Sequence, residues 1–270
     1  MSATSGIITI TTDFGTQDGY VAAMKGVMLG VCPDVRFVDV SHDIEAQDVM
    51  EGAFVLRNVV DHFPPGTVHL AVVDPGVGTD RRPVAVSLGG HRFVGPDNGL
   101  FSLVLSGRQP ESIVALSNPD IWTQAEPSST FHGRDVFAPA AAHLAAGRDM
   151  ADLGDPVESL ASMHWALPIS DDQGIQGWVV HVDRFGNCIT NISRKLVRDA
   201  SGGRSFKCYV GNAIIKEMNP TYARATPGDP TLLFNSSDML EVAIFRDNAS
   251  ELLDIRKGAA VNLVFSDDRS

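Results

Sequence analysis

The chain has 270 residues, 44% of them hydrophobic, which suffices to bury one large core or two modest ones. A net charge of −12 argues against a nucleic-acid partner, because such binding needs concentrated lysine and arginine, and favours a small cationic ligand. No apolar run approaches the roughly 18 residues of a membrane span, and the N-terminus shows no positive leader, so we expect a cytoplasmic protein without a membrane partner. Cys32, Cys188 and Cys208 are odd in number and far apart, which predicts buried thiols rather than disulfides.

The first half of the sequence alternates apolar runs typical of strands with runs typical of helices. The expected elements begin with a strand at 7–14, a helix near 19–31, a strand at 35–41, a helix near 46–63 and a strand at 68–75. Strands at 83–88, 92–97 and 113–117 and an alanine-rich helix at 135–147 follow. Such alternation predicts βαβ units, and therefore an α/β domain with a largely parallel sheet.

From about Gly177 the pattern changes to short strands at turn-rich intervals, with almost no helical period. The strand-like runs are 177–183, 188–193, 205–211, 231–236, 240–245 and 260–265. They predict a smaller all-β domain, either a barrel or a sandwich. We therefore expect an N-terminal α/β domain at 1–167, a linker at 168–176 and a C-terminal β domain at 177–270.

Acidic residues follow two of the expected parallel strands. The run TTDFG places Asp13 at the end of one strand, and VVDPG places Asp74 at the end of another. Ligands of open α/β sheets bind at the carboxyl ends of strands, so both are candidate site residues. Either aspartate also suits a simple turn, and Asp18 suits the N-terminal cap of the helix that follows it.

The run FHGRD places His132 directly before a helix, beside Gly133, where the backbone leaves room for a ligand. The basic pair Arg81 and Arg82 lies a few residues after Asp74, and one of these arginines can keep a strand-end carboxylate ionised. A structural histidine and two solvated surface charges are the alternative interpretation.

In the second half, VDRFGNCITNI offers an aromatic turn residue, Phe185, followed by Gly186 and Asn187. Such a turn can stack on a base and hydrogen-bond to it, but it also suits a plain hairpin. The run FNSSD supplies Ser236, together with Ser237 and Asp238.

Six motifs, taken in this order, resemble those of the S-adenosyl-L-methionine (SAM) hydrolases, also called SAM hydroxide adenosyltransferases, which are relatives of fluorinase and chlorinase. The motifs are TTDFGTQDGYVAAMKG, CPDVRFVDVSHDI, VVDPGVGTDRR, GPDNGL, FHGRDVFAPAAAHLA and VDRFGNCITNI. The resemblance covers residues 7–245. It implies a two-domain subunit and a homotrimer, with active sites shared between the N-terminal domain of one subunit and the C-terminal domain of the next.

The resemblance also implies roles for individual residues. The water-activating set corresponds to Asp74, Arg81 and His132, where Arg81 rather than Arg82 keeps the family spacing. Substrate-binding roles fall on Asp13 for the ribose hydroxyls, on Phe185 and Asn187 for adenine, on Asp183 and Ser236 for the methionine amino and carboxylate groups, and on Asp18 as a further contact.

The sequence departs from the halogenating relatives at the reacting centre. Those relatives carry a tyrosine at the position of Asp74 and another at that of His132, and a fixed carboxylate there repels a halide. They also carry an arginine at Ser237, a glycine at Asp238 and a tryptophan at Gln47. The differences at Asp74 and His132 favour a hydrolase over a halogenase, whereas the other three bear on the methionine carboxylate contact and on one wall of the pocket.

The implied reaction is attack of water on the ribose C5′ carbon of SAM, which releases adenosine and methionine without a metal or cofactor. Three alternatives stay open at this point. They are a SAM-dependent halogenase, a metal-dependent phosphohydrolase that collects ions on Asp13, Asp18, Asp74 and His132, and a nucleoside-binding protein without turnover.

Overall fold

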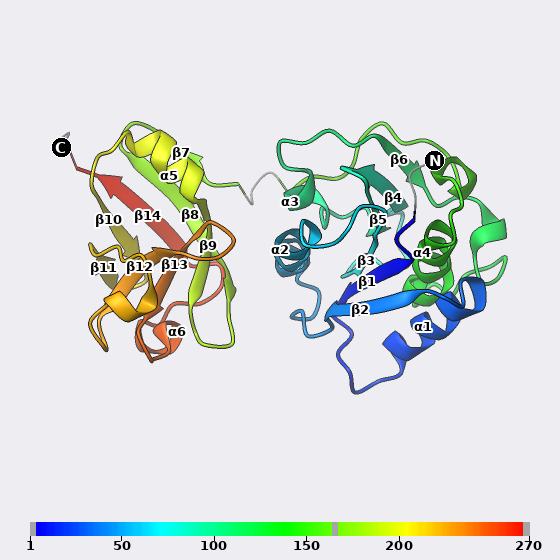
Figure 1. Ribbon diagram of the computed structural model, residues 1–270, viewed down its shortest axis with the longest axis horizontal. Coiled ribbons are helices and arrows are strands. Elements are labelled where there is room, and N and C mark those ends of the chain that lie inside the picture. Colours follow the sequence, from blue (N-terminus) through cyan, green and yellow to red (C-terminus); the bar gives the residue numbers. More distant parts are fainter. Residues whose placement is uncertain (1–3, 164–166, 267–270) are drawn as a thin grey trace. The chain divides into compact units, whose positions relative to one another are not determined.

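The computed structural model describes residues 4–163 and 167–266 (Figure 1). The chain forms two compact units, the first ending at Met163 and the second made of the residues that follow. The expected domains, 1–167 and 177–270, include residues 1–3, 164–166 and 267–270, which lie outside the described residues.

A six-stranded sheet forms the centre of the N-terminal unit, with the strand order β2-β1-β3-β5-β4-β6. Its strands are β1 (Ile7–Thr12), β2 (Arg36–Ser41), β3 (Val68–Val72), β4 (Pro83–Leu88), β5 (His91–Pro96) and β6 (Ser112–Ala115). The pairs β1–β2, β1–β3 and β3–β5 are parallel, whereas β4 pairs antiparallel with β5 and β6. The antiparallel part arises because the two-residue turn Gly89-Gly90 joins β4 to β5 as a hairpin. The expected α/β fold with a largely parallel sheet is confirmed.

The N-terminal unit contains the helices α1 (Tyr20–Val31), α2 (Val49–Val60), α3 (Ser102–Leu105), η1 (Pro119–Ile121), η2 (Gly133–Phe137), α4 (Ala138–Ala145) and η3 (Met150–Leu153). Helices α1 and α2 connect the parallel strands β1, β2 and β3, and further helices follow β5 and β6. The helix expected at 135–147 forms as a π-helical turn, η2, followed by α4. Pro139 has no N–H to donate to the Asp135 carbonyl, which accepts from the Thr123 N–H instead, and the Ala138 N–H bonds to the Gly133 carbonyl.

The C-terminal unit is an antiparallel sheet with the order β11-β10-β14-β8-β9-β13-β12, and β7 pairs with β8. Its strands are β7 (Ile169–Ser170), β8 (Gly174–Val182), β9 (Cys188–Ser193), β10 (Phe206–Val210), β11 (Ala213–Ile215), β12 (Pro230–Phe234), β13 (Met239–Ile244) and β14 (Ala260–Phe265). The end strands β11 and β12 contact each other, and a bridge joins Met218 to Leu232. The sequence allowed a barrel or a sandwich, and the sheet is nearly a barrel.

Two features of this unit differ from the expectation. The segment expected as a linker, 168–176, contains β7 and the first residues of β8, so part of it is hydrogen-bonded into the sheet. Helix α5 (Arg194–Ser201) was not expected; it begins where the Ser193 hydroxyl accepts from the Leu196 N–H, at 3.2 Å. The shorter helices η5 (Tyr222–Arg224) and α6 (Ala249–Leu252) complete the unit.

The three cysteines are free thiols. Cys188 and Cys208 are buried in the C-terminal core, and burial raises the pKa of each thiol to about 12. Among the described residues, no helix combines the length and the apolar character that crossing a membrane requires.

Candidate functional site

Asp13 and Asp74 follow neighbouring strands at the same edge of the N-terminal sheet. β1 and β3 are parallel neighbours in which Thr12 pairs with Val72, so the residues that follow them emerge on the same side. Asp13 follows β1 directly, and Asp74 comes two residues after β3. The placement inferred from strand ends is therefore correct for both aspartates.

Arg81 joins Asp74 to His132. Its Nε atom donates to Asp74 Oδ1 at 2.9 Å and to Oδ2 at 3.0 Å, and its Nη2 atom also donates to Oδ2. The same Nη2 atom lies 2.9 Å from His132 Nδ1. The side chains of Arg81 and Asp74 are only 8% and 6% exposed, so this ion pair is shielded from solvent. The three residues predicted to activate water are thus one hydrogen-bonded group.

Arg82, the neighbouring alternative, points elsewhere. Its Nε and Nη2 atoms bond to Asp97 Oδ2 at 3.0 and 2.6 Å, and Nη2 also bonds to the Ser159 carbonyl at 2.9 Å. Adjacent arginines therefore serve two different carboxylates, and Arg81 is the one that contacts Asp74.

The loop after β3 contains tight turns that reverse the chain, so that the Arg81 side chain reaches Asp74. The Val77 N–H bonds to the Asp74 carbonyl, and the Thr79 hydroxyl bonds to the Gly76 carbonyl at 2.6 Å. Gly78 has a φ of 78°, and a Cβ atom there would lie 2.6 Å from the Ser129 carbonyl oxygen. Asp74 is therefore a turn former as well as a candidate site residue, and the turn brings Arg81 back to it.

His132 is the N-cap residue of η2, and its ring has a defined hydrogen-bonding state. Because the Arg81 guanidinium can only donate, Nδ1 of His132 must accept, and the neutral ring then carries its proton on Nε2. Burial lowers the pKa of His132, and the Arg81 charge lowers it further, against the opposing effects of Asp74 and Asp135. The site therefore favours a neutral imidazole that donates through Nε2.

Asp74 and His132 line a pocket of about 330 Å³ with three aromatic residues, Phe14, Tyr20 and Phe131. The three rings contact one another, with centroid separations of 5.1–5.9 Å. No sequence signal groups these rings, because they lie far apart in the chain or beside charged residues that dominate the local pattern. They make one wall of the pocket apolar, which suits a reaction that must limit access of bulk water.

The other two acidic candidates of this unit differ in their contacts. The Asp13 carboxylate accepts from the Gln47 N–H through Oδ2, at 2.8 Å. Asp18 is exposed, and the N-cap of α1 is Gly19 without a side-chain hydrogen bond, so the interpretation of Asp18 as a helix cap is wrong.

In the C-terminal unit, Asp183, Phe185 and Asn187 line one pocket of about 530 Å³, whose other lining residues are Tyr222, Ile244, Arg246 and Asp247. Phe185 is 77% exposed, which leaves a large apolar surface free for stacking. Ser236 lies outside this lining, exposed in the turn between β12 and β13.

The Asp183 carboxylate holds the turn together. It accepts from the backbone N–H of Phe185 and of Asn187 and from Asn187 Nδ2, each at 2.9 Å. Because the Asn187 amide donates one N–H to Asp183, its carbonyl oxygen and its second N–H remain for a ligand. Asp183 therefore has an internal structural role that the resemblance did not imply.

A buried acid lies behind this pocket and was missed in the sequence. Glu241 on β13 is 1% exposed, and its Oε1 accepts from the Tyr222 hydroxyl at 2.6 Å. Burial raises the pKa of Glu241, and the nearby Asp183 raises it further, although hydrogen bonds from Tyr222 and Asn235 oppose the shift. A glutamate inside the apolar run LEVAI is the signal that could have identified it.

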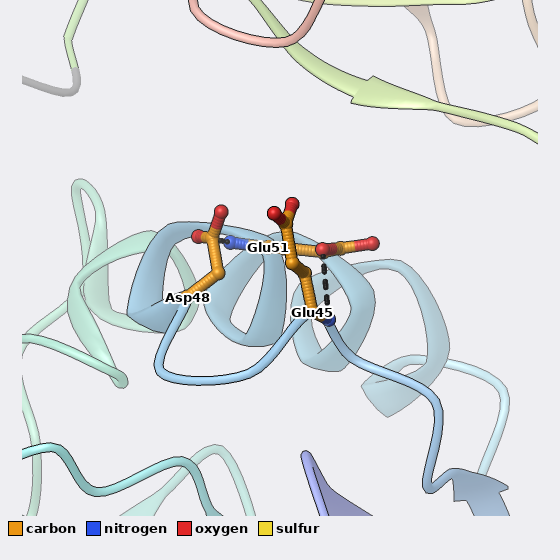
Figure 2. Close-up of side chains that lie close together, drawn as sticks. All are labelled: Glu45, Asp48 and Glu51. Atoms are coloured by element: carbon orange, nitrogen blue, oxygen red, sulfur yellow. Dashed lines mark hydrogen bonds between the residues drawn. The ribbon is translucent and has the colours of Figure 1, made fainter. Parts of the chain in front are cut away.

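Figure 2 shows the acidic group Glu45, Asp48 and Glu51 at the start of α2, where carboxylate oxygens of all three lie within 4.8 Å of one another. Asp48 caps the helix by accepting from the Glu51 N–H at 2.8 Å, and Glu51 accepts from the Glu45 N–H at 3.2 Å. Helix capping accounts for this group. Within the described residues, Asp13, Asp18, Asp74 and His132 do not form such a group.

Comparisons with known proteins agree on one family over most of the chain. The SAM hydroxide adenosyltransferase N-terminal domain matches residues 8–154, and the C-terminal domain of the same family matches residues 177–262. An (R)-S-adenosyl-L-methionine hydrolase of Thermus thermophilus is 40% identical, over 94% of this chain and 97% of that protein.

More distant relatives extend this pattern. A fluorinase of Actinopolyspora mzabensis is 30% identical, over 96% of this chain and 97% of that protein. The crystal structure of an uncharacterized conserved protein from Thermotoga maritima superposes with a TM-score of 0.87 at 31% identity, covering 95% of this chain and 99% of that one. The chain therefore belongs to the SAM hydroxide adenosyltransferase family.

Proposed function

We propose that this protein hydrolyses S-adenosyl-L-methionine to adenosine and L-methionine. Family membership and the hydrolase names of relatives such as the Thermus thermophilus protein support the substrate. The single observation that carries the chemistry is the shielded Asp74–Arg81 ion pair, hydrogen-bonded to His132, because Asp74 and His132 both line a pocket.

In this reaction the oxygen of a water molecule attacks C5′ of the ribose. The C5′–S bond breaks, its electron pair leaves with the neutral sulfur of methionine, and the water proton passes to Asp74. The sulfonium is already a good leaving group, so positioning of the water supplies most of the catalysis and no cofactor is needed. The carboxylates of the site and the net charge of −12 also attract the cationic substrate.

Asp74 is the proton acceptor in this scheme, and Arg81 orients it. His132 donates from Nε2 to the water oxygen, because Nδ1 is occupied by Arg81. Two fixed groups then hold the water, one at its oxygen and one at its proton. His132 is therefore a hydrogen-bond donor to the water. It does not accept the water proton, because neither of its ring nitrogens is free to do so.

The substrate-binding assignments extend the proposal. Asp13 accepts from the ribose hydroxyls, Phe185 stacks on adenine, and the Asn187 carbonyl oxygen accepts from the adenine amino group. Asp183 orients Asn187, and Asp18 and Ser236 remain candidates for the methionine end. We further propose a cytoplasmic location, where thiols such as the three here stay reduced.

The proposed activity is tested by incubating the purified protein with both sulfonium epimers of SAM, with and without chelator, and separating the products by chromatography. Adenosine and methionine in equal amounts, unaffected by chelator, are expected. Loss of activity with chelator would support the metal-dependent alternative, and binding of adenosine without turnover would support a nucleoside-binding protein.

In the pH profile of kcat/KM, the fall in activity on the acid side should have its midpoint below pH 6.5. Neutral His132 is the active form, and its pKa is lowered from the ordinary value of 6.5, so activity falls only as the pH drops through that lower value. Initial rates of adenosine release from pH 4.5 to 8 measure this limb. A midpoint at or above 6.5 would contradict the proposed state of His132.

A homotrimer with shared sites predicts complementation between two inactive variants. Asp74→Asn disables the N-terminal half of a site, and Asn187→Ala disables the C-terminal half. In trimers assembled at random from equal amounts of both, about a quarter of the sites combine two intact halves, so about a quarter of wild-type activity should return. Light scattering checks the trimer, and an inactive mixture of co-refolded subunits would refute sharing.

A further inference from the structure

A line of side-chain contacts runs from the surface to the backbone next to Asp13. Lys25 Nζ lies 2.6 Å from Asp39 Oδ2, Asp39 Oδ1 lies 3.1 Å from His42 Nε2, and His42 Nδ1 lies 2.8 Å from the Thr12 hydroxyl. Thr12 is the last residue of β1 and precedes Asp13. The contact between His42 Nδ1 and the Thr12 hydroxyl is a hydrogen bond whose donor depends on the tautomer of the ring.

The Thr12–His42 bond is buried on both sides. Thr12 is fully buried, and His42 is 7% exposed. The Thr12 oxygen also accepts from the Phe14 N–H at 3.3 Å, so the hydroxyl ties together the residues on either side of Asp13. A buried hydroxyl used in this way fixes the direction in which the chain leaves the strand.

The loop between β2 and α2 makes two further hydrogen bonds to the segment that follows β1. The Gly15 N–H donates to the His42 carbonyl at 2.7 Å, and the Gln47 N–H donates to Asp13 Oδ2 at 2.8 Å. Gln47 has a φ of 69°, a conformation that costs free energy for a residue with a side chain. The Asp13 carboxylate is therefore held through one oxygen, and Oδ1 is left for a ligand.

We propose that Thr12 and His42 are positioning residues that hold the Asp13 carboxylate in the orientation that binds the ribose hydroxyls. Asp39 and Lys25 support His42 from the surface. This inference rests on the proposed function, in which Asp13 binds the ribose. It assigns no chemical step to Thr12 or His42, so their effect falls on substrate affinity rather than on the reacting atoms.

The same strand offers a matched control. Thr9 is also fully buried on β1, and its hydroxyl lies 2.8 Å from Nδ1 of another buried histidine, His69 on β3. His69 Nε2 continues to His91, and none of these residues adjoins Asp13. Thr9→Val and Thr12→Val therefore each remove a buried hydrogen bond between a threonine and a histidine, one away from the site and one next to it. Thr12→Val also removes the acceptor of the Phe14 N–H.

The experiment compares the wild type with Thr12→Val, Thr12→Ser and Thr9→Val. For Thr12→Val we expect KM for SAM and Kd for adenosine to rise about 10-fold, with kcat changed less, because a buried hydrogen bond is lost while Asp74, Arg81 and His132 are untouched. Thr12→Ser retains the hydroxyl and should restore both values. Thr9→Val should lower Tm without changing KM.

A double-mutant cycle with Asp13→Ala separates positioning from general destabilisation. Once Asp13 is replaced, adding Thr12→Val should weaken adenosine binding no further, since the group that it orients is gone. Unchanged KM and Kd in a folded Thr12→Val protein, an equal rise in Thr9→Val, or additive losses with Asp13→Ala would each overturn the inference. If the wild type does not hydrolyse SAM, the proposed function fails instead, and adenosine calorimetry still tests the role of Thr12.

Discussion

Asp74→Asn is expected to lower kcat for SAM hydrolysis by about 10² to 10⁴-fold, the usual contribution of a positioned general base. Asparagine has nearly the same shape but cannot accept the water proton, and it removes the negative charge that holds Arg81. Single-turnover release of adenosine measures the chemical step, and adenosine calorimetry shows whether the nucleoside still binds.

Asp97→Asn is the matched control for this substitution. Asp97 has a side chain only 4% exposed and pairs with Arg82, as Asp74 pairs with Arg81, but it lies outside the lining of the pocket. A general loss of stability would affect both variants, whereas loss of the base affects only Asp74→Asn. Equal activities in the two variants would exclude Asp74 as the proton acceptor.

The same carboxylate should also decide which nucleophile reacts. Two charges about 4 Å apart at an effective dielectric near 20 interact by about 4 kcal/mol, enough to keep chloride from the position of the water. In high chloride we expect the wild type to release adenosine only, and Asp74→Ala to lose most hydrolysis. Any 5′-chloro-5′-deoxyadenosine should appear only with that variant; its ready formation by the wild type would contradict the assignment.

Arg81→Lys is expected to reduce kcat by about 10² to 10³-fold, although the positive charge is kept. One guanidinium reaches both Asp74 oxygens and His132 Nδ1, whereas a single ammonium group cannot reproduce that planar geometry. The affinity for adenosine should change little, because no Arg81 contact involves Asp13. Rates at saturating SAM, together with Kd for adenosine, separate the two effects.

Arg82→Lys provides the control for Arg81→Lys. The two residues are adjacent in sequence and each pairs with an aspartate, yet Arg82 bonds to Asp97 and to the Ser159 carbonyl. Activity near the wild-type value is expected. A comparable fall in kcat for both variants would show that the loop, rather than the Arg81 contact, determines the rate.

Local patterns were sufficient for the N-terminal fold and for the edge where its site lies. Strand ends predicted that Asp13 and Asp74 would lie at the carboxyl edge of the sheet, and the parallel pair β1–β3 carries both to that edge. Helix α5 was missed because its eight residues lie among strands, where the apolar pattern of the neighbours dominated.

The tertiary structure decided which contacts these residues make. Sequence by itself determined the α/β and β units, the strand-end acids and the motifs that resemble one family. It left Arg81 and Arg82 equivalent in chemistry, and only the turns at Gly76 and Gly78 aim Arg81 at Asp74. Arg81 bonds to His132, and His42 bonds to Thr12, across long separations in the chain. Such bonds depend on how strands pair and loops close, and the local sequence patterns do not show this.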